Sequence, residues 1–388
     1  MIPHLLRILE IIAAAAAIAS NFYFILCLWS AARFHRGRKS DAGASPSFFP
    51  LISILKPLKG TDPEMYESFR SHCLQDYPDY EIIFGVSETD DPAIALVERL
   101  KVEFPQRSIR LVICRDNLGP NTKVSNLIQM ERAAHYDHLI VSDSDIRVSQ
   151  DYLRRVISSL SDPQVGLVTC LYRGIGNSTL GSRLEALGVS TDFCPGVLVA
   201  QQIEGIKFGL GATLAFRRRE LQAIGGFESL VDYLADDYQL GRRISALGLK
   251  VEIPNIIVET FLARYTLSSF FDHQLRWART IRDSRFGGYV GMGITYGLPW
   301  AILTLLLARG ANWAWALLAI TAVMRGAVAL KVGQGILQDS QVKRWFALLP
   351  LRDVIAVLVW LISFFGHSII WRGQRFRLQK GKLVRIPE

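Results

Sequence analysis

The feature that most constrains the fold is a stretch without any charged side chain, which runs from Ile11 to Ala32 near the amino terminus. About 20 apolar residues in a row are enough for a helix to cross the hydrocarbon core of a bilayer. The stretch stays apolar as far as Trp29 and then meets basic residues, whereas a cleaved signal peptide has a shorter apolar core and a small-residue cleavage site. We therefore expect residues 1–32 to form a retained transmembrane helix, with a cleaved signal as the alternative.

Basic residues follow this helix directly and predict its orientation. They are Arg33, His35, Arg36, Arg38 and Lys39. Because positively charged loops stay in the cytoplasm, the polar block after them is expected to be cytoplasmic. Much of the net charge of +9 lies beside apolar segments and in the basic tail 372–388. That placement favours anionic lipid headgroups over nucleic acid, because no aromatic residues are interleaved with the basic ones on a soluble platform.

The central block has the pattern of an α/β domain. Residues 33–47 form a basic and polar linker, and residues 48–265 alternate β-rich runs with helix-length segments, which predicts a mostly parallel sheet covered on both faces. The expected strands are 51–55, 81–86, 110–114, 138–142 and 165–171, and the expected helices are 63–75, 92–104, 122–135 and 152–160. Ligands bind such sheets at the carboxyl ends of the strands.

The last third of the chain is apolar again. Residues 266–288 have the pattern of an interfacial amphipathic helix. Apolar spans follow at Tyr289–Ala308, Ala311–Leu330 and Val354–Trp371. Three crossings would place the basic tail outside, against the positive-inside rule. We therefore expect either that one segment of 289–371 is re-entrant or interfacial, first of all the one with Arg325, or that a further crossing lies near 345–351.

Two acidic motifs follow expected strands. Asp90 and Asp91 come a few residues after the second strand, and Asp143 and Asp145 directly follow the fourth. Residues i and i+2 of an extended chain point to the same side, so Asp143 and Asp145 can face one divalent ion, Mg²⁺ or Mn²⁺, held against a nucleotide diphosphate. Solvated turn residues are the alternative for a single motif of this kind.

A third acidic pair, Asp236 and Asp237, opens a helical pattern. Carboxylates stabilise the positive end of a helix, so capping is the alternative explanation. Two adjacent acids exceed what a cap requires, and a hydroxyl that attacks an anomeric carbon needs a positioned base. We expect Asp237 to be this base, with Asp236 beside it, in a single displacement that inverts the anomeric configuration.

Two further clusters carry groups suited to phosphate. Lys123 and Asn126 follow a glycine-containing turn into a helix, where an anion is favoured, although an ordinary turn and cap is the alternative. His273, Arg276 and Trp277 lie on the amphipathic helix. Arg276 can neutralise a departing diphosphate, and Trp277 can offer a flat surface to an acceptor sugar or lipid.

In this order, the motifs resemble those of the ceramide glucosyltransferases and their bacterial relatives, among the inverting, family 2-type transferases of nucleotide-diphospho-sugars. The similarity covers nearly the whole chain and runs through Lys56–Gly60, Asp90–Ile94, Asn121–Asn126, Ser142–Val148, Val165–Val168, Ala235–Tyr238, Arg276–Trp277 and Trp371–Arg375. It implies a GT-A nucleotide-sugar-binding domain with a Rossmann-like sheet over 48–265, and transmembrane helices on either side of it.

The resemblance also implies roles for individual residues. Asp143 and Asp145 correspond to the metal-binding motif, and Asp237 corresponds to the base. The residues expected to contact the donor are Asp90, Asp91, Lys123, Asn126, Asp143 and His273. The final motif of the family, (Q/R)xxRW, maps onto Arg276 and Trp277, but its first position is His273 here. A histidine can still donate a hydrogen bond to a phosphate or a hydroxyl.

The expected activity is transfer of glucose or N-acetylglucosamine from a UDP-sugar to a hydroxyl of a membrane lipid, either ceramide or a hopanoid. The expected location is a bacterial inner membrane, with the catalytic domain in the cytoplasm. One alternative is a processive polysaccharide synthase, although obvious spans are few for a polymer channel. Another is a catalytically silent membrane protein that binds nucleotide sugars, although such a protein would not need every acidic motif. No nucleic-acid partner is expected.

Overall fold

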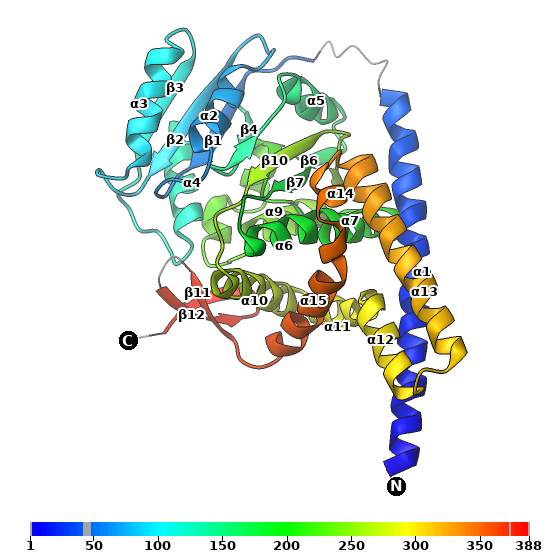
Figure 1. Ribbon diagram of the computed structural model, residues 1–388. Coiled ribbons are helices and arrows are strands. Elements are labelled where there is room, and N and C mark those ends of the chain that lie inside the picture. Colours follow the sequence, from blue (N-terminus) through cyan, green and yellow to red (C-terminus); the bar gives the residue numbers. More distant parts are fainter. Residues whose placement is uncertain (1, 42–47, 372–373, 387–388) are drawn as a thin grey trace. The chain divides into compact units, whose positions relative to one another are not determined.

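The computed structural model describes residues 2–41, 48–371 and 374–386 (Figure 1). The chain divides into two compact units. The helical unit contains Met1–Ser40, Gly176–Glu204 and Arg264–Gly373, and the sheet unit contains Asp41–Ile175, Gly205–Ala263 and Gln374–Glu388.

The sheet unit is built on a seven-stranded sheet of order β3-β2-β1-β4-β8-β6-β9. Its strands are β1 Ile52–Pro57, β2 Tyr80–Val86, β3 Ser108–Ile113, β4 His138–Val141, β6 Val165–Thr169, β8 Leu214–Arg217 and β9 Lys250–Glu252. Neighbouring strands are parallel except around β8, which is antiparallel to both β4 and β6. The expected mostly parallel α/β sheet is therefore confirmed.

Two smaller pairings complete the strands of this unit. Strand β10 (Ile257–Phe261) pairs antiparallel with β5 (Ile146–Arg147) and parallel with β7 (Leu171–Ile175). Near the carboxyl end, β12 (Gln374–Gln379) and β13 (Lys382–Arg385) form an antiparallel hairpin. The expected strand 165–171 is thus two strands in different sheets, β6 and β7.

Helices of the sheet unit pack on the large sheet through apolar side chains. They are α2 Met65–Cys73, α3 Ala93–Glu103, α4 Thr122–Ala133, α5 Tyr152–Ser158, α8 Arg218–Ala223 and α9 Asp236–Ala246, with short 3-10 turns at η1 Ser159–Ser161 and η3 Phe227–Leu230. Leu127 of α4 and Leu240 of α9 belong to the same buried cluster as Leu55 and Val141 of the sheet. This packing fixes the amino-terminal ends of α4 and α9, which carry candidate site residues.

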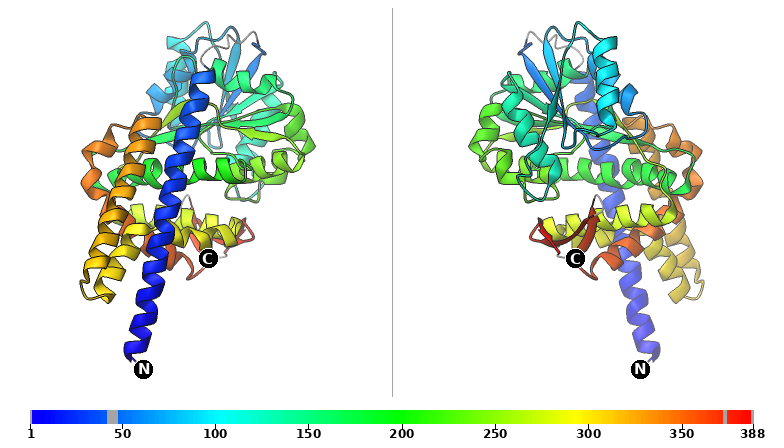
Figure 2. Two further views of the ribbon diagram at one scale, coloured as in Figure 1. Left: turned by 90° about the vertical axis from the view of Figure 1, so that its right-hand side faces the viewer. Right: turned by 90° about the vertical axis from the view of Figure 1, so that its left-hand side faces the viewer.

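The helical unit consists mainly of apolar helices. They are α1 Ile2–Asp41, α6 Leu180–Gly188, η2 Val189–Phe193, α7 Cys194–Ile203, α10 Leu267–Ser284, α11 Phe286–Gly291, η4 Met292–Thr295, α12 Gly297–Leu307, α13 Asn312–Val328, η5 Ala329–Ile336, α14 Gln341–Arg344, η6 Phe346–Leu348 and α15 Leu349–Ser363, followed by the strand β11 Ser368–Trp371. Figure 2 shows α1 as one unbroken helix. The segments η2 and η5 have π-helical geometry.

Within the described ranges, three helices are long and apolar enough to cross a membrane, namely His4–Arg36, Asn312–Ile336 and Phe346–Ser363. A fourth span exists if the pair Phe286–Thr295 and Gly297–Leu307, bent by 57°, counts as one. The apolar helix near the amino terminus is confirmed. The expected span Val354–Trp371 has shifted bounds, because its helix ends at Ser363 and residues 368–371 form a strand. The segment near 345–351 is the beginning of this same helix and not a further crossing.

Candidate active site

The carboxyl end of β4 carries the first part of the candidate site. Asp143 and Asp145 follow Val141 and Ser142 at this point, as expected from the sequence. They are not on an extended chain, because Ser144 and Asp145 form a turn before β5. Asp143 forms an ion pair with Lys123, with 2.7 Å between Nζ and Oδ1. Asp145 accepts a hydrogen bond from Thr260 Oγ1 on β10.

Lys123 joins two of the acidic motifs. It lies on the first turn of α4, whose N-cap Asn121 accepts a hydrogen bond from the Val124 amide. Its ammonium group is 2.7 Å from Asp143 and 3.4 Å from Asp236. Burial opposes its charge, but the carboxylates of Asp143 and Asp236 outweigh burial and raise the pKa of Lys123 above its usual range. Lys123 is therefore a fixed cation between two carboxylates.

Asp236 and Asp237 form the first turn of α9, and the residue at the N-cap is Ala235, without a side-chain cap. Asp237 Oδ1 accepts a hydrogen bond from the next amide, that of Tyr238, at 2.7 Å. The carboxylates of Asp237 and Asp143 face the same point, since a Cβ placed on Gly211 would be 3.2 Å from one and 3.4 Å from the other. The acidic pair is thus part of one cluster with Asp143, in addition to lying at a helix end.

Two carboxylates of this cluster have raised pKa values. Burial and the neighbouring Asp236 raise the pKa of Asp237 to about 6. Burial and the neighbouring Asp143 raise the pKa of Asp145 to about 6. A general base works best when its pKa is near the operating pH, so Asp237 has the protonation behaviour that proton abstraction needs.

The cluster has the chemistry of a partial metal site. The ammonium of Lys123 interacts with Asp143, Asp236 and Asp237, and Asp145 interacts with Asp143. Excess negative charge of this kind attracts a cation. Among the described residues, no three His, Cys, Asp or Glu side chains converge as a protein cage for a metal ion. Mg²⁺ is usually bound by one or two carboxylates together with substrate phosphates. The residues present therefore fit a metal ion whose coordination a diphosphate completes.

Lys56 is a polar residue of the site that begins the Lys56–Gly60 motif but is not one of the expected site residues. It is fully buried near the end of β1 and donates hydrogen bonds to the Asp143 carbonyl at 2.8 Å and to Ser142 Oγ at 3.1 Å. Burial lowers its pKa to about 7, against the opposing effect of Asp143 and Asp145. The signal in the sequence is a lysine within a strand whose other residues are uncharged. The hydrogen bond from Lys56 holds the backbone carbonyl of Asp143 in place.

Other expected donor contacts have local partners. Asp91 is buried and accepts hydrogen bonds from the amides of Gly60 and Ala93, both at 2.9 Å, so it joins the loop after β1 to the start of α3. Asp90 beside it is exposed. Asn126 Oδ1 accepts a hydrogen bond from Ser87 Oγ at 2.9 Å. These contacts shape the loops that follow β1 and β2.

The remaining expected site residues lie on α10 in the helical unit. The ring of His273 stacks on Tyr265, with 5.3 Å between centroids, and is also 5.3 Å from the ring of Trp277. Trp277 in turn contacts Phe193 edge-on at 6.1 Å. Arg276 lies between His273 and Trp277 in the sequence, on the same helix. The three residues of the motif are thus on one helix, with two of them in a group of aromatic rings.

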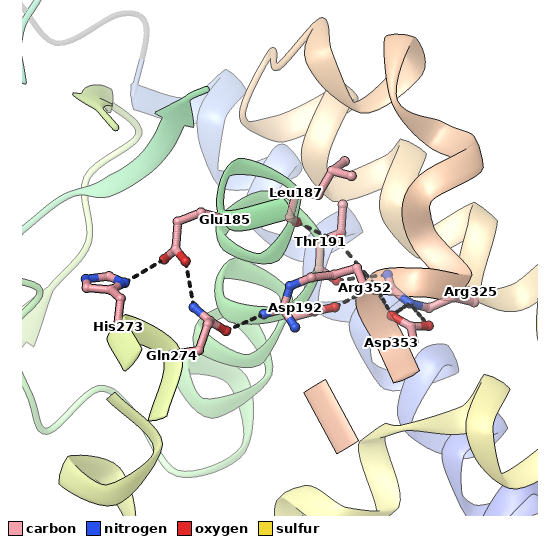
Figure 3. A network of polar contacts seen from close by, with 9 residues as sticks. All are labelled: Glu185, Leu187, Thr191, Asp192, His273, Gln274, Arg325, Arg352 and Asp353. Atoms are coloured by element: carbon pink, nitrogen blue, oxygen red, sulfur yellow. Dashed lines mark hydrogen bonds and ion pairs between the residues drawn. The ribbon is translucent and has the colours of Figure 1, made fainter. Parts of the chain in front are cut away.

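A buried polar network lies next to this motif, as Figure 3 shows. Gln274 donates to the buried carboxylate of Glu185 at 2.7 Å and accepts from Arg352 at 3.0 Å. His273 Nδ1 is 3.5 Å from Glu185. The network connects α10 with α6 and α15, and the sequence motifs did not predict it.

The same network explains a charge within an apolar helix. Arg325 on α13 is buried and lies 2.8 Å from Asp353 on α15 and 2.6 Å from Asp192 in η2 (Figure 3). Arg325 Nη1 also donates to the carbonyl of Thr191 at 3.0 Å. Ionisable residues in apolar spans are usually paired in this way. Arg325 is therefore compatible with a membrane-spanning α13.

Comparison with known proteins supports the resemblance. The family model of glycosyl transferase family 21 matches residues 11–384. Ceramide glucosyltransferase 3 of Caenorhabditis elegans is 27% identical over 269 residues, which cover 67% of this chain and 57% of that protein. The ceramide glucosyltransferase of Komagataella phaffii is 37% identical over 114 residues, which cover 28% of this chain and 22% of that protein. For the two C. elegans relatives, the chain spans about half of their length.

A solved structure shows the same fold. It is the mannosyltransferase PcManGT of Pyrobaculum calidifontis, in complex with GDP-Man and Mn²⁺, with a TM-score of 0.55 and 19% identity. The match covers 92% of this chain and 99% of that one. With the mainly parallel sheet, this likeness confirms the expected GT-A fold.

Proposed function

The chain belongs to glycosyl transferase family 21, and from this premise we propose that it is a membrane-bound inverting glycosyltransferase. It transfers glucose or N-acetylglucosamine from a UDP-sugar to a hydroxyl of a membrane lipid, either ceramide or a hopanoid. The observation that carries the proposal is the cluster of Asp143, Lys123, Asp236 and Asp237 at the end of β4 and the start of α9. The names of the curated relatives support a lipid acceptor.

Asp237 acts as the general base. Its carboxylate removes the proton from the acceptor hydroxyl as the oxygen attacks the anomeric carbon, and the bond to the diphosphate breaks on the opposite face. One displacement of this kind inverts the anomeric configuration. The pKa of about 6 leaves most of Asp237 ionised at neutral pH while keeping it basic enough to take a proton. The charges of its neighbours act on this carboxylate in opposite directions, since Asp236 raises the pKa of Asp237 and Lys123 lowers it.

The donor side uses Asp143 and Asp145, which would hold Mg²⁺ or Mn²⁺ against the diphosphate. The bound ion would neutralise the charge that develops on the leaving group. Lys123 and the loops organised by Asp91 and Asn126 bind the rest of the nucleotide, with Asp90 beside them. On α10, Arg276 pairs with phosphate, His273 donates a hydrogen bond and Trp277 offers an apolar surface to the acceptor.

The hydrogen bonds of the hairpin support a specific membrane topology. The hairpin 374–386 is hydrogen-bonded within the sheet unit, where the Leu383 amide donates to the Asp232 carbonyl at 2.7 Å. The hairpin and the sheet unit therefore lie on one side of the membrane, which requires an even number of crossings between them.

Asn21 donates to Thr321 at 2.9 Å, and Leu28 lines a cleft with Ala327 and Leu330, so α1 and α13 run parallel. Asn312–Ile336 therefore crosses in the same direction as α1, which requires a crossing before it. The bent pair Phe286–Thr295 and Gly297–Leu307 supplies that crossing, and Phe346–Ser363 is re-entrant or interfacial. With the basic end of α1 in the cytoplasm, this arrangement keeps Lys343, Arg344 and the basic hairpin on the cytoplasmic side of a bacterial inner membrane.

The test is transfer of label from UDP-glucose and, separately, UDP-N-acetylglucosamine into lipid that organic solvent extracts. Membranes carry either the natural chain or Asp237→Asn, with ceramide and hopanoid acceptors added. Label that depends on Asp237 and resides in a lipid with one sugar supports the proposal, and mass analysis of the product identifies the acceptor. A polymeric product would instead indicate a processive synthase. Folded protein without transfer or metal-dependent UDP binding would indicate a silent nucleotide-sugar binder.

A further inference from the structure

The last strand of the chain is hydrogen-bonded to the segment that leads into Asp236 and Asp237. The Leu383 amide donates to the Asp232 carbonyl at 2.7 Å, and the Leu234 amide donates to the Gly381 carbonyl at 3.3 Å. The ammonium of Lys382 lies 3.1 Å from the Asp232 carboxylate. Because α9 begins at Asp236, the hairpin β12–β13 is attached only a few residues before the proposed base.

The opposite edge of this segment is held by Asn121. Its side chain donates to the Tyr233 carbonyl at 2.7 Å, and its amide donates to the Val231 carbonyl at 2.9 Å. Asn121 also caps α4, the helix that carries Lys123. Residues 231–236 therefore lie between α4 and the hairpin, and a displacement of the hairpin changes the position from which α9 starts.

The hairpin has one buried and one exposed surface. Phe376, Leu378 and Leu383 are buried. The basic side chains of the hairpin are exposed, so this second surface is accessible to a ligand. A ligand bound there acts on the segment 231–236 through the hydrogen bonds that join it to the hairpin.

The exposed side chains of the hairpin are strongly basic. The cations are Arg375, Arg377, Lys380, Lys382 and Arg385, and residues 374–386 contain neither Asp nor Glu. A cleft of about 510 Å³ beside β13 is lined by Lys382 and Arg385 together with Gly119 and Pro120. Phosphate-bearing lipid headgroups match this charge, and a dense set of Lys and Arg next to a membrane segment is the pattern that anionic lipids bind.

The chain also keeps the hairpin close to a bilayer. Ten residues, 364–373, separate the end of the apolar helix at Ser363 from the start of β12 at Gln374. An extended chain of this length reaches at most about 40 Å. An anionic membrane surface is thus always within reach of the basic side chains.

We propose that the β12–β13 hairpin docks on anionic lipid headgroups and that this contact orders residues 231–236, which position the proposed base. The catalytic consequence rests on the function proposed above, whereas the docking and the ordering do not. Turnover is then higher on an anionic bilayer than on a neutral one, through kcat and not through the KM of the donor.

The test uses the full chain in nanodiscs of phosphatidylcholine alone or with about one third phosphatidylglycerol, a fraction that gives a strongly negative surface. The rate of hydrogen exchange at the amides of Leu234 and Leu383 measures how well the hydrogen bonds between the hairpin and residues 231–236 are ordered. Assays of sugar transfer measure kcat and the KM of the donor. The test variant is Arg375→Gln/Arg377→Gln. The matched control, Arg132→Gln/Arg219→Gln, removes two exposed cations from α4 and α8 of the same unit.

We expect anionic lipid to slow exchange of both amides and to raise kcat at least about threefold in the natural chain and the control, but not in Arg375→Gln/Arg377→Gln. Equal responses of both variants, or no response of the natural chain, would overturn the proposal. If inorganic phosphate in neutral nanodiscs gave the same protection, a soluble anion would replace the lipid and the proposal would also fail. Lipid-dependent exchange without any transfer would leave docking intact and count against the proposed function alone.

Discussion

The ammonium group of Lys123 lies 2.7 Å from the carboxylate of Asp143, so a residue at the start of α4 pairs with a residue that closely follows β4. It also lies 3.4 Å from Asp236, next to the proposed base. One cation therefore acts on both the proposed metal-binding motif and the proposed base. Its removal affects both functions, and the pH dependence of activity separates them.

Replacing Lys123 by methionine should lower kcat at pH 7 by about tenfold or more, because each unit by which the pKa of Asp237 rises costs a factor of ten in ionised base below that pKa. The natural Asp237 already has a pKa raised to about 6, and Lys123 opposes a larger rise. The loss should shrink at pH 8.5, where the carboxylate is ionised again. Steady-state rates at both pH values check this, with Lys101→Met on the exposed face of α3 as control. An equal loss at both pH values would contradict it.

Asp237→Asn should reduce kcat by about 10²–10⁴-fold, the usual contribution of a general base. Binding of UDP should stay within a factor of two, because the amide has the same shape and the donor contacts other residues. Asp236→Asn is the paired variant and should cost less, since Asp236 pairs with Lys123 and is not the proposed base. Single-turnover rates and UDP titration measure the two effects. Near-normal turnover in Asp237→Asn would rule out the base assignment.

Asp145→Asn should raise the Mn²⁺ concentration needed for half-maximal transfer by at least about tenfold, because one of two carboxylate ligands loses its charge. Its hydrogen bond with Thr260 can be kept by the amide oxygen, so folding should change little. Chelation of divalent ions should stop transfer by the natural chain. Thr260→Val is a useful control, since it removes the hydrogen bond and leaves the charge. Unchanged Mn²⁺ dependence in Asp145→Asn would exclude it as a ligand.

The sequence predicted the strands and acidic motifs of the site well, because both depend on local pattern. Apolar runs bounded by polar residues indicated β1 to β4 to within a few residues, and Asp143 and Asp237 lie where a strand ends and a helix begins. Strand β8 was not predicted. It is short and pairs with β4 and β6, and pairing of this kind has no signal in local periodicity.

The polar network of the helical unit was beyond motif reasoning for the same reason. Glu185 and Asp192 lie on helical segments far along the chain from their partners Gln274 and Arg325. Their spacing matches no motif, and a buried acidic side chain differs from an exposed one only through its tertiary surroundings. Arg325 was the one visible sign, because an arginine in an apolar span requires a partner.

The contribution of His72 to folding stability should fall as the pH drops below about 6.5, the ordinary pKa of histidine. Burial, together with the charge of Lys56, lowers the pKa of His72 well below that value in the folded protein. At His72 the unfolded chain then binds more protons than the folded one below pH 6.5, and this contribution decreases with falling pH by up to about 1.4 kcal/mol per unit. Asp145 and Asp237, whose pKa values are raised to about 6, act in the opposite direction, so the difference between the natural chain and a His72 variant isolates the contribution of His72. Thermal unfolding in detergent between pH 7.5 and 5 measures this slope. His72→Gln should flatten it, whereas His4→Gln, at an exposed site, should not.

The ion pair of Arg325 with Asp353 makes a prediction that distinguishes pairing from simple packing. Both side chains are buried, and Arg325 also pairs with Asp192. Arg325→Met leaves the buried carboxylate of Asp353 and the half-buried one of Asp192 without this cation and should cost about 3–5 kcal/mol of stability. Adding Asp353→Leu removes one of these charges and should recover part of the loss, because an apolar pair of similar volume is often as stable as a buried ion pair. Unfolding temperatures and the yield of folded protein in detergent compare the two variants with the natural chain. A double variant less stable than Arg325→Met alone would contradict this prediction. Asp353 would then stabilise the helices by packing or by its other contacts, and its charge pairing with Arg325 would not be the source of stability.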